Sequence, residues 1–135
     1  MLVPHATVIA VIDGRNFELW RNAGNEAAPK LEAVTSPKLD EHDKSAGARH
    51  YSSSGNPTGH QLDEDAHAAA AAAWLNGEVL GHRIDKLVVI AAPRTLGELR
   101  RHWHGQTSAA LLSEVAKDLV GRTGEEIVAA LREKG

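Results

Sequence analysis

Residues 86–101, KLVVIAAPRTLGELRR, decide the fold that this sequence predicts. Within them, residues 87–92 are continuously apolar and rich in β-branched side chains, and Pro93 closes the run. Such a run is typical of a strand covered on both faces, most often a parallel strand inside an α/β sheet. The residues after Pro93 have the spacing of a short amphipathic helix. We therefore expect an α/β fold built around this strand.

The N-terminal part predicts a three-stranded meander. Residues 6–12 have the composition of a second buried strand, and Asp13 with Gly14 indicates a tight turn. Residues 16–21 continue as the hairpin partner, and residues 30–36 supply a third extended segment.

The clearest predicted helix spans residues 63–80. The acids at 63–65 provide an N-cap and favourable charge at the positive end of the helix dipole, and Gly81 is a natural stop. Later, Thr123 followed by Glu126 predicts the capped start of a last helix. The side chains expected to rest on the sheet are Trp74, Leu75 and Leu80.

Two segments are harder to interpret. Residues 108–119 have helical spacing of apolar side chains, so periodicity alone indicates a helix. Residues 37–62 have broken periodicity, and a loop of this length is either functional, like a lid, or a mobile surface loop. Lys44, Arg49 and His50 in this loop, with its serine hydroxyls, are suited to anions.

Composition excludes several classes of protein. The 135 residues carry a net charge of -3, whereas general nucleic-acid binders are strongly basic. Cysteine is absent, which excludes disulfides and thiolate metal sites. No apolar stretch approaches the roughly 18 to 20 residues that cross a bilayer. We expect a single domain, residues 1–135, that is cytoplasmic and does not insert into a membrane.

Several motifs occur together and in order: DG at 13–14, Gly47 with Arg49, APRTLGELR at 92–100 and VAKDL at 115–119. Together they resemble the bacterial family named "protein required for attachment to host cells", over nearly the whole chain. The resemblance implies that VAKDL is a strand. The element order becomes βββαβαβα, a ribonuclease H-like topology with flanking helices. Right-handed crossovers then give a mixed five-stranded sheet in the order 3-2-1-4-5.

That family in turn is similar to the middle domain of archaeal and eukaryotic peptide release factors. There, a Gly-Gly-Gln motif precedes the long helix, and this chain has Gly59, His60 and Gln61 at the corresponding place. A histidine side chain forbids backbone conformations that glycine adopts, which argues against peptidyl-tRNA hydrolysis. The competing interpretation is a fortuitous loop tripeptide.

The candidate site lies at the carboxyl ends of the strands, where open α/β sheets bind ligands. Asp13, Arg94, Lys117 and Asp118 are expected there, beside the start of the long loop with Arg49. Arginine forks suit phosphate, so the basic segment could contact RNA, although a solvated helix face has the same composition. That basic segment comprises Arg94, Arg100, Arg101, His102 and His104.

Catalytic patterns are weak. A two-metal nuclease needs converging carboxylates, and Asp13 stands where the first would be, with Asp118 and either Glu64 or Asp65 as companions. The central strand ends without an acid, however, and Asp13 also suits a plain turn. No nucleophile elbow or phosphate loop occurs. We therefore predict no catalytic residue, no metal ligand and no cofactor.

The resemblance and the basic segment favour a non-catalytic module that binds RNA or the ribosome. A metal-dependent nuclease or phosphodiesterase and a protein-interaction module affecting attachment are the alternatives. Protein partners and the oligomeric state are left open. The binding residues predicted are Asp13, Arg49, Gly59, Gln61, Arg94, Arg100, Lys117 and Asp118.

Overall fold

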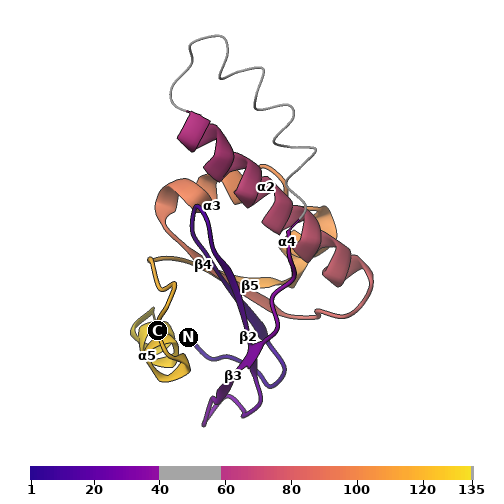
Figure 1. The fold of residues 1–135 in the computed structure, drawn as a ribbon. Coiled ribbons are helices and arrows are strands. Elements are labelled where there is room, and N and C mark those ends of the chain that lie inside the picture. The colour runs from indigo at the N-terminus through magenta and orange to yellow at the C-terminus, as the bar shows by residue number, and fades with distance from the viewer. Residues whose placement is uncertain (40–58, 135) are drawn as a thin grey trace.

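The computed structural model describes residues 1–39 and 59–134 (Figure 1). Most of the predicted loop, with Arg49, lies outside these residues. In chain order the elements are β1 (Val8–Ile12), β2 (Phe17–Asn22), β3 (Leu31–Val34), α2 (Gly59–Leu80), β4 (Leu87–Ala91), α3 (Pro93–Arg100), α4 (Gly105–Ala110), β5 (Leu111–Ala116) and α5 (Gly124–Lys134).

The strands form one mixed five-stranded sheet in the order β3-β2-β1-β4-β5, which confirms the predicted topology. The meander β1-β2-β3 is antiparallel, whereas β4 runs parallel to both β1 and β5. All five residues of β4 are buried. The run from Leu87 to Ala91 is apolar throughout because this strand has neighbours on both edges and helices over both faces.

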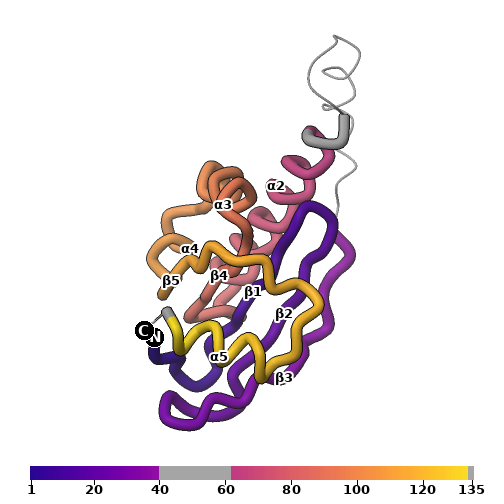
Figure 2. Tube along the Cα trace, turned by 90° about the vertical axis from the view of Figure 1, so that its left-hand side faces the viewer, coloured from indigo at the N-terminus to yellow at the C-terminus, as the bar shows by residue number. Residues whose placement is uncertain are grey.

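Helices cover both faces of the sheet (Figures 1 and 2). Helices α2, α3 and α4 lie on one face and α5 on the other. Alternate residues of β4 serve the two layers: Val89 packs with α2 and α3, whereas Ile90 packs with Ile127 and Leu131 of α5. None of the helices in the described part of the chain has both the length and the apolar character to cross a bilayer.

Small side chains let α2 lie close to the sheet. Ala71, Ala72 and Leu75 are fully buried against it. Leu80 was expected to contact the sheet as well, but it is 48% exposed. Val79 is 9% exposed and packs in the core instead, because it lies four residues after Leu75 on the same helix face.

Helix α2 begins at Gly59, four residues before the predicted start. No proline separates Gly59 from Asp63, and the intervening residues tolerate helix, so the helix extends back by one turn. The acids at 63–65 therefore lie in the second turn and do not cap the helix. The prediction that Gly59 to Gln61 form a loop ahead of the helix was wrong.

Helix α2 ends at Leu80, as predicted, but the left-handed residue is not Gly81. His82 has φ 61°. The His82 N–H donates to the Val79 carbonyl (3.0 Å) and the Arg83 N–H to the Glu78 carbonyl (2.9 Å). These two bonds form a Schellman cap, in which the position after the cap usually belongs to glycine.

The ambiguous segment contains both kinds of structure. Strand β5 contains Val115 and Ala116 of the VAKDL segment that the resemblance implied to be a strand, but it ends before Lys117, and the preceding helix α4 is an element that the predicted order lacks. His104 caps α4, because its Nδ1 accepts a hydrogen bond from the Gln106 N–H (3.0 Å). Asn76 of α2 holds the same turn through the His104 N–H (2.9 Å) and the Thr107 hydroxyl (2.6 Å).

Candidate functional site

Asp13 follows β1 and stabilises the hairpin turn to β2 with its side chain. Its Oδ1 accepts hydrogen bonds from the backbone N–H groups of Arg15 (2.8 Å) and Asn16 (2.5 Å), and its Oδ2 accepts one from Asn16 Nδ2 (3.0 Å). The hairpin is confirmed, but Gly14 and Arg15 form its centre and neither has a positive φ. Asp13 therefore flanks the turn and acts as an Asx-type acceptor.

These contacts keep Asp13 ionised near neutral pH. Partial burial raises the pKa of the Asp13 carboxyl. Hydrogen bonds from Asn16 and Arg15, together with the charge of His67, lower the pKa by more than burial raises it. The net result is a pKa below the ordinary value. Three local donors already occupy this carboxylate, which suits a structural acceptor better than a general base.

Helix α2 brings two more polar side chains to this turn. Glu64 lies against Gly14 so closely that a Cβ on residue 14 would come within 2.7 Å of the Glu64 carboxyl carbon. His67 is 4% exposed, and its Nε2 lies 3.2 Å from the Asn16 carbonyl oxygen. The turn after β1 is thus packed under the N-terminal half of α2.

Arg94 adds a cation to the same edge of the sheet. It lies in the first turn of α3, directly after β4, and its Nη2 is 3.2 Å from Asp65 Oδ1 of α2. β1 and β4 are parallel neighbours, so their carboxyl ends place these groups together. We call the set the carboxyl-end cluster: Asp13, Glu64, Asp65, His67 and Arg94.

The carboxyl-end cluster does not have the geometry of a metal centre. Among residues 1–39 and 59–134, no three His, Asp or Glu side chains gather closely enough to hold a metal ion. Asp13 is engaged by the turn and Asp65 by Arg94. A two-metal nuclease would need carboxylates that converge on the metal ions. In the described cluster, Asp65 is paired with Arg94, and Asp13 accepts hydrogen bonds from its own turn.

Arg100, the second predicted arginine, lies away from this cluster. Its Nε donates to Glu114 Oε1 of β5 (2.8 Å), and Trp103 Nε1 donates to the other oxygen (3.4 Å). These side chains border a hollow of about 380 Å³ beside the edge strand β5. Arg100 of the basic segment therefore has a counter-ion, Glu114, that belongs to the neighbouring strand β5.

The remaining predicted residues that the structure describes are not part of the carboxyl-end cluster. Lys117 follows β5, but its Nζ pairs with Glu133 of α5 (3.1 Å). Asp118 is exposed beside it, and β4 separates both from Asp13 by two strand spacings, about 10 Å. Gly59 and Gln61 lie in the first turn of α2.

The predicted binding residues do not include two residues that shape these sites. His67 could have been found, because His67, Ala71 and Leu75 follow one another at intervals of four residues and so share the buried face of a helix. Glu114 gave no signal, since its partner Arg100 belongs to a different element and only the packing of α3 on β5 joins them.

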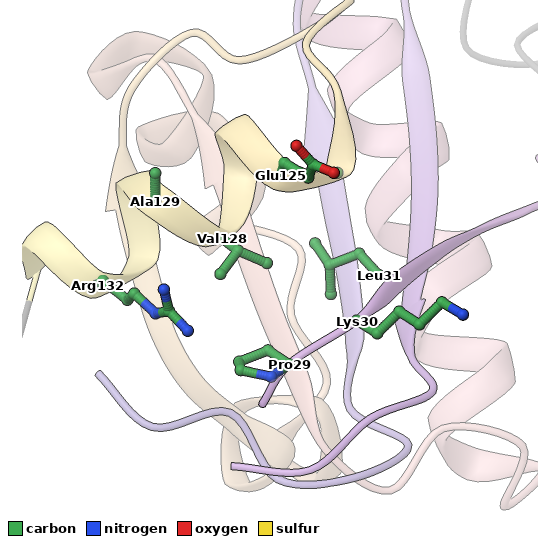
Figure 3. A pocket seen from close by; sticks show the side chains of 8 residues that line it. Pro29, Lys30, Leu31, Glu125, Val128, Ala129 and Arg132 are labelled. Carbon is green, nitrogen blue, oxygen red and sulfur yellow. The ribbon is translucent and has the colours of Figure 1, made fainter. Parts of the chain in front are cut away.

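A larger hollow, of about 540 Å³, lies between α5 and the chain that enters β3 (Figure 3). Pro29, Leu31 and Val128 form its apolar part, and Glu125 and Arg132 stand at its two ends. Of the predicted site residues within 1–39 and 59–134, none lines it. It opens on the α5 side of the sheet, whereas α2 and α3 of the carboxyl-end cluster cover the other side.

Residues 6–131 match the model of a family described as bacterial archaeo-eukaryotic release factor family 12. This match confirms the predicted relationship to release factors. Comparison with curated proteins gives no match. The resemblance to the host-attachment family stays a prediction.

Proposed function

The chain belongs to bacterial archaeo-eukaryotic release factor family 12, and from this membership we propose that it is a non-catalytic module that binds RNA of the translation machinery. The observation that carries the proposal is the extent of the match, which runs from residue 6, before β1, to residue 131 in α5. A fortuitous similarity in one short motif would not cover every strand of the sheet.

Two features support the non-catalytic part of the proposal. His60 replaces the glycine expected in a Gly-Gly-Gln motif, and the tripeptide lies in the first turn of α2 instead of a free loop. A glutamine used in hydrolysis has to approach the reacting ester, which a backbone committed to helical hydrogen bonds restricts. In the carboxyl-end cluster, the carboxylates of Asp13 and Asp65 already accept hydrogen bonds from neighbouring donors.

The arginines of the basic segment support RNA as the ligand. The side chains of Arg94, Arg100 and Arg101 are 54%, 56% and 75% exposed. Each lies beside an acid that orients the guanidinium, and for Arg100 and Arg101 this pair uses only part of the five donors. The remaining donors suit phosphate oxygens. The acidic neighbours are Asp65, Glu114 and Glu98 respectively.

The test is the salt dependence of binding to labelled ribosomal and transfer RNA fragments. We compare the natural protein with the double variant Arg94→Ala and Arg100→Ala. Loss of two phosphate contacts should weaken binding for all sequences and lower the slope of log K against log salt by about 1.4. Arg132→Ala, which removes an exposed arginine of α5, serves as the matched control. Undetectable RNA binding at low salt, or equal slopes for all three proteins, would overturn the proposal.

A further inference from the structure

Two adjoining hollows lie at the amino ends of the parallel strands, on the opposite edge of the sheet from the carboxyl-end cluster. One, of about 240 Å³, is mostly polar, and the other, of about 300 Å³, is mostly apolar. Arg21 of β2 and Arg83, which follows α2, line both, so the two hollows are neighbours. Together they reach the size at which ligand sites are usually found.

The polar hollow is basic. Besides the two shared arginines it is lined by His5, Lys86 and one acid, Asp85. Arg21 and Lys86 are exposed and have no ion-pair partner within the described residues. Two cations without a counter-ion leave their donors available to an anion.

Arg83 is fixed in place before any ligand arrives. Its Nε donates to Glu78 Oε2 (2.7 Å), and its guanidinium lies against Gly81, where a Cβ would come within 2.6 Å of Nη1. The left-handed backbone of His82 makes this return of the chain possible. The bond to Glu78 uses the Nε donor, and Nη2 also donates to the Gly77 carbonyl (3.4 Å), so part of the five guanidinium donors remains for a ligand in the hollow that Arg83 lines.

The loop on the other side of the polar hollow is equally well fixed. Asn22 is fully buried, and its Nδ2 donates to the Val3 carbonyl (2.9 Å). Its Oδ1 accepts from the N–H groups of Gly24 and Lys30 (2.9 Å each), and its carbonyl accepts from the Ala6 N–H (2.8 Å). The segment that carries His5 is thus held by a buried hydrogen-bond network, and little ordering remains for a ligand to induce.

The apolar hollow offers an aromatic wall. Trp74 of α2 lines it and is braced edge-on by Phe17, at a ring-centroid distance of 5.6 Å. Aliphatic side chains form most of the remaining lining of this hollow, and Glu78 is the acidic residue that lines it. The aliphatic residues are Val8, Leu19, Val34 and Ile84.

We propose that the joined hollows bind a nucleotide unit, with its phosphate at Arg21 and Lys86 and its base against Trp74. Guanidinium and ammonium groups are the usual partners of phosphate. A planar base has the flat apolar faces that an aromatic side chain recognises. The distance between the charged and apolar ends is short because Arg21 belongs to both hollows. This site is separate from the basic segment of the proposed RNA contact and does not depend on it.

The test is NMR titration of the ¹⁵N-labelled protein with AMP, GMP and UMP, with ribose 5-phosphate as the ligand that lacks a base. The indole N–H signal of Trp74, identified by its loss in Trp74→Phe, should shift with the nucleotides and not with ribose 5-phosphate. Arg21→Gln and Lys86→Gln should each weaken nucleotide binding by about tenfold, as expected for one charge-assisted contact. Arg132→Gln, on α5, should leave it unchanged.

A second titration distinguishes the source of the nucleotide. If the ligand is a free nucleotide, AMP, GMP or UMP binds at least as well as a 5′-phosphorylated RNA pentamer. If the ligand is the 5′ end of an RNA strand, only the pentamer binds, and Arg21→Gln should weaken binding of the pentamer by the same factor of about ten. Absence of a Trp74 shift with every ligand, or binding that both glutamine variants retain, would overturn the proposal. Binding here that survives Arg94→Ala and Arg100→Ala would also show that this site and the proposed RNA contact are distinct.

Discussion

Asp13 illustrates how local chemistry sets the role of a single residue. A carboxylate at the end of the first strand is where a ribonuclease H-like nuclease would hold a metal. Here the two oxygens accept three hydrogen bonds from Arg15 and Asn16. The sequence already allowed the turn interpretation, because aspartate before glycine is typical of turns. The buried neighbour His67 could be predicted only from its spacing to Ala71 and Leu75.

The lowered pKa of Asp13 predicts a specific dependence of stability on pH. A carboxyl whose pKa is lower in the folded than in the unfolded state stabilises the fold above the unfolded value of about 3.9. That contribution is lost as the pH falls through the folded pKa. Asp13→Asn, which keeps the shape but not the charge, should therefore cost more free energy of unfolding at pH 6 than at pH 3. Urea unfolding at both pH values measures this, and an equal cost at both would contradict it.

At the scale of elements, the sequence predicted correctly those elements whose structure follows from their own residues. The apolar run of β4 and the helix beginning at Pro93 were predictable, because each depends on its own sequence pattern. The segment from α4 to β5 was not. Its apolar residues have helical spacing, yet a six-residue helix capped by His104 ends at Ala110 and a strand follows at once. Residues 111–116 form a strand because they pair with β4, and the periodicity of the sequence does not show which strand a segment pairs with.

The C-terminus of α2 predicts a stabilising substitution. His82 adopts a left-handed backbone, which costs a residue with a side chain about 1 kcal/mol or more relative to glycine. His82→Gly should therefore raise the free energy of unfolding by about 1 kcal/mol. His82→Ala is the control, since it removes the same side chain but retains the strain. Urea denaturation measures both, and a gain with alanine as large as with glycine would show that the imidazole, not the backbone, is responsible.

At the scale of the molecule, the sheet order followed from connectivity, because right-handed crossovers leave few arrangements for the strands. The charges could not be placed in the same way. A net charge of -3 hides a basic segment on α3 and a basic hollow at the amino ends of the strands. Which cations find counter-ions depends on contacts such as Arg100 with Glu114, which join distant parts of the chain.

The most direct test of the proposed translation role is sedimentation of the protein in a sucrose gradient of extract from its own cells. At moderate salt we expect it to travel with ribosomal particles, and at high salt to be released, because phosphate contacts weaken as salt rises. The variant with Arg94→Ala and Arg100→Ala should stay at the top of the gradient in both conditions. If the natural protein stays with the free proteins even at low salt, the proposed association with the translation machinery is wrong.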